Sequence, residues 1–183
     1  KSSNRILLNV GGGIQTNYTY YKNIFEDEVD PDSKNWNLNA TIGYRTNLPE
    51  EKETDKTGFE KSKGNVLAMF VKKGTTNIPS LEMSNIDFTE VEFGFISKEV
   101  LRVSFGFGNR SIGDEYKGSL TTPSNYYCGT TSLIMHKNRL ALEVGATWLF
   151  NKELEPLDAK LSANLNLKFY FLRKIYKVTK DKL

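Results

Sequence analysis

The sequence predicts an all-β protein in which eight antiparallel strands follow one another around a closed, up-and-down barrel. Apolar residues recur at every second position in segment after segment, as they do along a strand with one apolar face. No segment carries the 3.6-residue apolar repeat of a long amphipathic helix. The connections alternate between long and short, which is typical of a barrel with tight turns at one end and loops at the other.

The first three expected strands lie in residues 5–73. Residues 5–21 place their apolar side chains on one face: Ile6, Leu8, Val10, Ile14, Tyr18 and Tyr20. Residues 36–45 do the same with Trp36, Leu38, Ala40, Ile42 and Tyr44. The third segment, residues 64–73, is weaker, because its apolar run from Val66 to Val71 shows no clean alternation.

The remaining expected strands lie in residues 88–96, 101–108, 126–136, 139–150 and 159–171. The alternation is weakest in residues 126–136. It is unbroken in the last segment, where the apolar set is Ala159, Leu161, Ala163, Leu165, Leu167, Phe169 and Phe171. Several of these segments are longer than the usual five or six residues of a strand in a soluble sheet.

Two short connections predict hairpins. A two-residue turn at Lys137 and Asn138 would place Met135 opposite Leu140, with the apolar side chains of both strands on one face. A three-residue loop over residues 96–98 would place Glu92 directly opposite Arg102, so that opposite charges meet on the polar face. The charged connection of residues 48–63 is long where a short turn is expected, which indicates an insertion or a mobile loop.

Composition excludes several classes of protein. The 183 residues include 38% hydrophobic and 26% charged residues, and the longest apolar run is far shorter than the ~20 residues of a spanning helix. The aromatic content of 12% and the near balance of charge, with a net charge of +3, argue against disorder and against nucleic acid as a ligand. The single cysteine, Cys128, excludes an intrachain disulfide.

Three features predict that the apolar face points outward to lipid. The polar face carries many mid-strand glycines, which suit a crowded interior and would weaken a strand without such a role. It also carries a predicted interior charge network of both signs: Glu90, Glu92, Arg102, Glu143, Lys160 and Lys168. The apolar runs are long enough for an apolar band of about 25 Å. Aromatic residues near the strand ends are typical of interfacial girdles: Tyr18, Tyr20, Trp36, Tyr44, Tyr127, Trp148, Phe150, Phe169 and Phe171.

Over roughly residues 5–171, this pattern resembles the small eight-stranded outer-membrane β-barrels of Gram-negative bacteria, the OmpA/OmpX-like group. The best local match is residues 159–171, AKLSANLNLKFYF, which is similar to the C-terminal signal that the outer-membrane assembly machinery recognises. The abundance of Asn, Lys and Tyr resembles envelope proteins of the Bacteroidota type. The resemblance implies a transmembrane barrel with a polar interior in the bacterial outer membrane.

From these features we expect an integral outer-membrane barrel with a structural or interaction role and no enzymatic activity, acting through its loops or as a subunit of an envelope assembly. Its expected partners are membrane lipid, lipopolysaccharide and other envelope proteins, with no nucleic acid and no cofactor. Two alternatives stay open. One is a soluble lipocalin-like barrel that holds an apolar ligand inside. The other is a lipid-modifying barrel enzyme.

A few residues carry candidate chemistry. His136, the only histidine, could share the polar face with Ser132 and Glu143, a combination found in hydrolases, but its place at a tight turn favours a rim residue. The acidic residues 26–32 offer clustered carboxylates of the kind that Ca²⁺ prefers, but without the spacing of an EF-hand, so no metal site is expected. The barrel domain is expected to cover residues 1–171, and residues 172–183 to form a basic tail.

Overall fold

A computed structural model describes residues 3–22, 28–29, 32–48, 53–54, 60–61, 65–78, 83–98, 100–111, 125–150, 153 and 159–177. Side chains are described over residues 5–16, 35–45, 65–77, 86–98, 100–111, 125–150, 153 and 163–176. Every regular element in this part of the chain is a β-strand.

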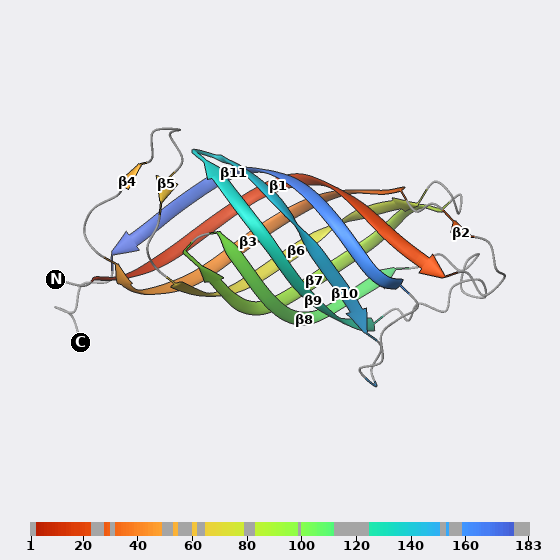
Figure 1. The fold of residues 1–183 in the computed structure, drawn as a ribbon. Helices are drawn as coiled ribbons and strands as arrows, with labels where there is room; N and C mark the ends of the chain where they lie inside the picture. The colour runs from red at the N-terminus through yellow and green to blue at the C-terminus, as the bar shows by residue number, and fades with distance from the viewer. Residues whose placement is uncertain are drawn as a thin grey trace.

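Eight long strands form a closed antiparallel barrel, as Figure 1 shows. They are β1 (Ser3–Lys22), β3 (Asp32–Leu48), β6 (Asn65–Ile78), β7 (Met83–Ser97), β8 (Leu101–Ser111), β9 (Asn125–Lys137), β10 (Leu140–Phe150) and β11 (Ala159–Lys177). Each strand pairs with the next along the chain, and β11 pairs with β1 to close the barrel. The predicted all-β class and eight-stranded antiparallel barrel are therefore confirmed.

Three short strands lie at the two ends of the barrel. β2 (Glu28–Val29) pairs with the end of β1, at the end that we call the loop end. At the opposite, turn end, β4 (Glu53–Thr54) pairs with β5 (Glu60–Lys61). The connection that departs from the short-turn pattern thus contains a small hairpin of its own. The start of β1 and the end of β11 also lie at the turn end (Figure 1).

Both tight turns lie further along the chain than the sequence predicts, so the strand pairing is shifted by two residues in the β9–β10 hairpin and by four residues in the β7–β8 hairpin. The β9–β10 turn consists of Asn138 and Arg139, so Lys137 pairs with Leu140 and Met135 with Leu142. Asn138 has a φ of 54°, a left-handed conformation that asparagine tolerates better than most residues. In the β7–β8 hairpin Ser97 pairs with Leu101. Glu92 therefore lies opposite Gly106 and not opposite Arg102.

The last strand continues six residues beyond its expected end at Phe171 and reaches Lys177. A register shift in the β1–β11 pairing leaves Phe171 without a direct partner, because Val10 pairs with Leu172 and Gly11 with Tyr170. The extra residue exchanges the two faces of the strand, as a β-bulge does. Residues 172–177 of the expected basic tail are therefore strand, and residues 178–183 lie outside the described part.

Buried apolar side chains gather toward both ends of the barrel. Near the turn end, one cluster consists of Leu7, Val66, Ala68, Phe70 and Ile96. A second cluster near that end consists of Ile134, Ala141 and Tyr170. Toward the loop end, Tyr126, Cys128 and Leu149 pack together. These clusters leave a zone between them, and that zone contains the charged side chains described next.

Candidate functional site

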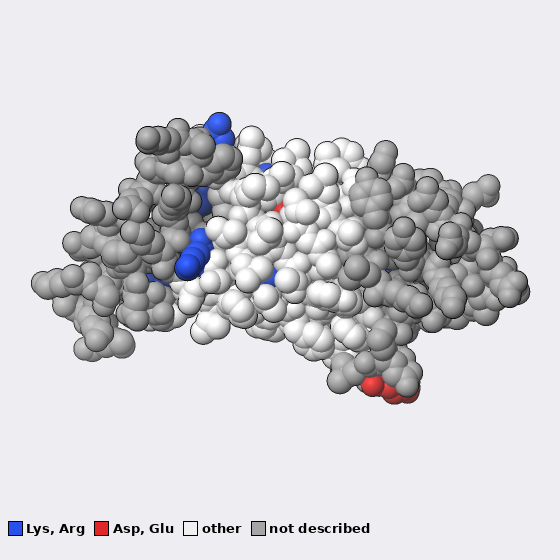
Figure 2. All heavy atoms as spheres, in the orientation of Figure 1, with Lys and Arg blue, Asp and Glu red and all other residues white. Residues whose placement is uncertain are grey.

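The strand faces divide large exposed hydrophobic side chains from buried polar and charged ones. Along β8, Leu101, Phe105 and Phe107 are exposed, whereas Arg102 and Ser104 are buried. In Figure 2 the middle of the molecule shows almost no charged side chain at its surface, and the visible charges lie mainly toward the ends of the described region. Exposed apolar and buried charged side chains are the reverse of the usual arrangement in a water-soluble protein.

Four charged side chains form a chain of ion pairs across β7, β8, β10 and β11; we call it the interior network. The Arg102 guanidinium contacts Glu92 (Nη2 to Oε1, 3.1 Å) and Glu143 (Nη1 to Oε1, 3.2 Å). Glu143 also forms an ion pair with Lys168. Acidic and basic groups alternate along this chain, so the four formal charges cancel. All four residues are buried.

Neighbouring hydroxyl groups complete the interior network. Ser104 donates to Glu92 Oε2 at 2.5 Å and accepts from Arg102 Nε at 3.0 Å, and Ser132 donates to Glu143. The Arg102 guanidinium lies 3.8 Å from the centre of the Phe70 ring, which allows a cation–π contact. Each carboxylate therefore has both a cation and a hydroxyl partner, as a buried charge requires.

Glycines make room for these side chains where strands approach closely. A Cβ at Gly106 would lie 2.5 Å from Glu92 Cα, and a Cβ at Gly108 would lie 2.5 Å from the Tyr126 hydroxyl oxygen. Gly106 thus lets β8 approach the backbone of β7 at Val91 and Glu92, and Gly108 leaves space for the Tyr126 ring. This close approach is the physical reason for glycine in the middle of these strands.

A second ion pair, between half-buried Lys72 and buried Glu90, lies closer to the loop end. Lys72 Nζ is 2.6 Å from Glu90 Oε2, and the Tyr126 hydroxyl donates to Glu90 Oε1 at 2.8 Å. Lys72 also lies 3.4 Å from Gln15 Oε1 and 5.4 Å from the centre of the Phe88 ring. Lys72 is the residue of this region that sequence analysis missed. Because residues 66–71 are all apolar, the sequence did not reveal which face of β6 points into the barrel. The inward face is that of Val66, Ala68 and Phe70, and Lys72 continues it.

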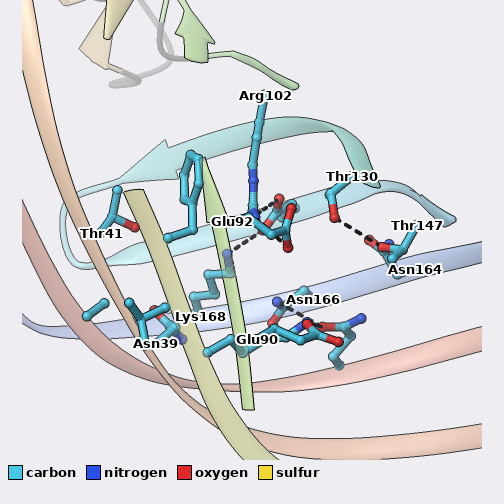
Figure 3. A pocket seen from close by; sticks show the side chains of 16 residues that line it. Asn39, Thr41, Glu90, Glu92, Arg102, Thr130, Thr147, Asn164, Asn166 and Lys168 are labelled. Atoms are coloured by element: carbon cyan, nitrogen blue, oxygen red, sulfur yellow. Dashed lines mark hydrogen bonds and ion pairs between the residues drawn. The ribbon is translucent and has the colours of Figure 1, made fainter. Parts of the chain in front are cut away.

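Amide and hydroxyl side chains lie beside the charged residues in the barrel interior, and Figure 3 shows Asn39, Asn164 and Asn166 among them. Asn166 Nδ2 donates to Gln15 at 3.4 Å, and Asn164 Nδ2 donates to Thr147 at 2.9 Å. These side chains and the charged residues together line a cavity of about 30 Å³. A polar space of this size has room for roughly two water molecules.

Of the six predicted network residues, the structure joins four in one chain: Glu92, Arg102, Glu143 and Lys168. Glu90 belongs to the second ion pair with Lys72. The side chain of Lys160 lies outside the described part. Although the β7–β8 register differs from expectation by four residues, Arg102 still reaches Glu92, because a shift by an even number of residues keeps both side chains on the same face.

The predicted aromatic girdle residues that the structure describes lie mostly on the exposed faces. Exposed members are Trp36, Tyr44, Tyr127, Trp148, Phe169 and Phe171, and Phe150 is half-buried. Phe105 stacks on Tyr127 with ring centroids 6.1 Å apart, and Phe169 meets Phe171 edge to face at 5.7 Å. The side chains of Tyr18 and Tyr20 lie outside the described part.

The other candidate residues do not assemble into a triad. Ser132 and Glu143 are hydrogen-bonded, but no described hydrogen bond joins His136 to either of them. The His136 ring instead packs against Tyr170, with ring centroids 5.9 Å apart. Cys128 is buried and has no disulfide partner. Among the described residues no group of three or more His, Cys, Asp and Glu side chains could hold a metal ion, and the carboxylates of residues 26–32 lie outside the described side chains.

No helix long and apolar enough to cross a bilayer occurs in the described ranges. No known protein family, curated protein sequence or solved structure matches the chain.

Proposed function

We propose that the chain is an integral β-barrel of a bacterial outer membrane with a structural or interaction role. The observation that carries this proposal is the reversal of the two strand faces. Large hydrophobic side chains such as Leu165 and Phe105 are about half exposed, while Glu92, Arg102 and Glu143 are almost completely buried. Acyl chains are the environment that suits the first set, and a closed barrel satisfies all of its backbone groups within a bilayer.

A structural role fits the interior better than transport does. The interior network is neutral as a whole and fully paired, and the clusters around Phe70 and around Cys128 lie toward the two ends of it. The cavity of about 30 Å³ is too small for a solute larger than water. An eight-stranded barrel is just wide enough for side chains to fill. The loops, or a surface of the barrel, would then contact lipopolysaccharide or other envelope proteins.

The same cavity weighs against a lipocalin-like function. A site for a small apolar ligand typically has a volume of about 300–1,000 Å³ and apolar walls. The cavity in this barrel is an order of magnitude smaller, and charged residues such as Glu90 and Lys168 line it. The exposed hydrophobic side chains would, in water, form an apolar surface much larger than soluble monomers carry.

Tryptophan fluorescence tests the proposal. The chain has two tryptophans, Trp36 and Trp148, which are 60% and 36% exposed. If their faces contact lipid, phospholipids brominated on the acyl chains will quench both, after the barrel folds into vesicles and shows the heat-dependent gel mobility of a folded membrane barrel. Quenching no stronger than in unbrominated vesicles, together with a monodisperse protein in buffer without detergent, would refute the proposal.

A further inference from the structure

An open groove crosses the outer surface of the barrel from β10 to β7. Two rows of directly paired residues form its sides. The first row runs through Leu140, Phe169, Gly12, Leu38 and Lys73. The second row runs through Leu167, Ile14, Trp36, Thr75 and Asp87. With neighbouring strands ~4.8 Å apart, the first row is about 19 Å long.

The absence of a side chain at Gly12 deepens the groove in its middle. Gly12 lies between two large exposed residues, Phe171 and Leu38, whose nearest atoms would be 3.6 and 3.8 Å from a Cβ at this position. Those are ordinary contact distances, so a larger side chain at Gly12 would fit the backbone and would fill the groove. The walls on either side are apolar and aromatic, with Trp36 and Phe169 both exposed.

The groove has a charged end and an apolar end. Leu140 directly follows the β9–β10 turn, whereas Lys73 and Asp87 lie in the halves of β6 and β7 nearer the loop end. Both charged side chains are exposed. No ion pair joins either of them to another side chain in the part of the chain that the structure describes. Thr75, two residues after Lys73 on the same face of β6, pairs directly with Asp87, so the cation and the anion are diagonal neighbours on the outer face.

We propose that this groove binds one phospholipid with a zwitterionic phosphoethanolamine headgroup. Lys73 pairs with the phosphate, Asp87 accepts hydrogen bonds from the ammonium group, and an acyl chain lies along the apolar walls past Gly12. This inference rests on the proposed function, since the groove meets lipid only if the barrel is in a membrane. An anionic headgroup without an amine would satisfy Lys73 but would place its negative charge beside Asp87.

The test measures which lipid stays with the barrel. The full chain is folded into vesicles of equal parts phosphatidylethanolamine and phosphatidylglycerol, extracted with mild detergent, and examined by native mass spectrometry. We expect one retained phosphatidylethanolamine in preference to phosphatidylglycerol. Lys73→Gln and Gly12→Leu should each lower its retention about fivefold or more, the effect of one headgroup charge contact or of a filled groove. Asp87→Asn should remove the preference between the two lipids.

Two controls separate this effect from general damage. Lys137→Gln removes an exposed lysine outside the groove, and Ala146→Leu adds bulk to an outward position of β10 that does not line it. Both should retain the lipid like the parent. Equal retention of the two lipids by the parent, or unchanged retention in Lys73→Gln, would overturn the proposal. A lipid-free dimer would also overturn it and would favour a second copy of the chain in the groove. Failure to insert at all, with no tryptophan quenching, would instead refute the proposed function.

Discussion

Glu143 is the side chain on which the interior network depends most. It accepts from Arg102 at 3.2 Å, from Ser132 and from Lys168. In a Glu143→Gln variant, Arg102 keeps its contact with Glu92 at 3.1 Å, but Lys168 loses its only ion-pair partner among the described side chains. The net formal charge of the network changes from zero to +1.

The expected loss of stability is that of one uncompensated buried charge. Breaking a buried ion pair by removing one partner costs about 3–5 kcal/mol. With an m-value of ~2 kcal/mol/M, the midpoint of urea unfolding would fall by roughly 2 M. The assay is urea titration of the folded barrel in detergent micelles, followed by tryptophan fluorescence and by gel mobility without heating.

The double variant Glu143→Gln/Lys168→Gln restores neutrality, so its midpoint should lie closer to the parent than that of Glu143→Gln alone. Lys137→Gln, which removes an exposed charge at the β9–β10 turn, should change stability by less than about 0.5 kcal/mol. If Glu143→Gln also changes the free energy of unfolding by less than about 0.5 kcal/mol, water and not the ion pairs stabilises these charges. The account of a closed, charge-paired interior would then be wrong.

Three further outcomes follow from the same contacts, each measured by urea titration, in lipid vesicles for the second variant and in detergent micelles for the others. Tyr126→Phe removes the hydrogen bond to Glu90 and should cost about 1.5–3 kcal/mol; no loss would mean that water replaces the hydroxyl. Leu165→Arg places a charge on the exposed face and should cost about 2–4 kcal/mol in bilayers; equal stability there would argue against lipid contact. Gly106→Ala forces a Cβ to 2.5 Å from a neighbouring Cα and should destabilise more than Gly12→Ala, whose Cβ meets only ordinary contacts; the opposite order would contradict the assigned faces.

The alternation along the chain was sufficient to predict the strands and which side chains share a face. It could not determine the exact pairing, because a shift by an even number of residues leaves every side chain on the same face. The β7–β8 turn illustrates this: the predicted and observed registers differ, yet Glu92 and Arg102 meet in both. The pattern predicted β6 weakly, because its inward face is apolar at Val66 and charged at Lys72. It ended β11 too early, because the faces of that strand exchange after Phe171.

The sequence by itself determined that each strand has one apolar and one polar face, because that property depends only on the two-residue period of a strand. The tight turns added that neighbouring strands are antiparallel. Tertiary structure alone decided which partners the buried charges take. Lys72 and Glu90 come from neighbouring strands, but Glu143 of β10 meets Arg102 of β8 across the barrel interior. That contact joins strands that share no backbone pairing, and it depends on the radius and closure of the barrel, which no local pattern encodes. The outer groove has the same origin, since only closure of β11 onto β1 brings Phe169 beside Gly12.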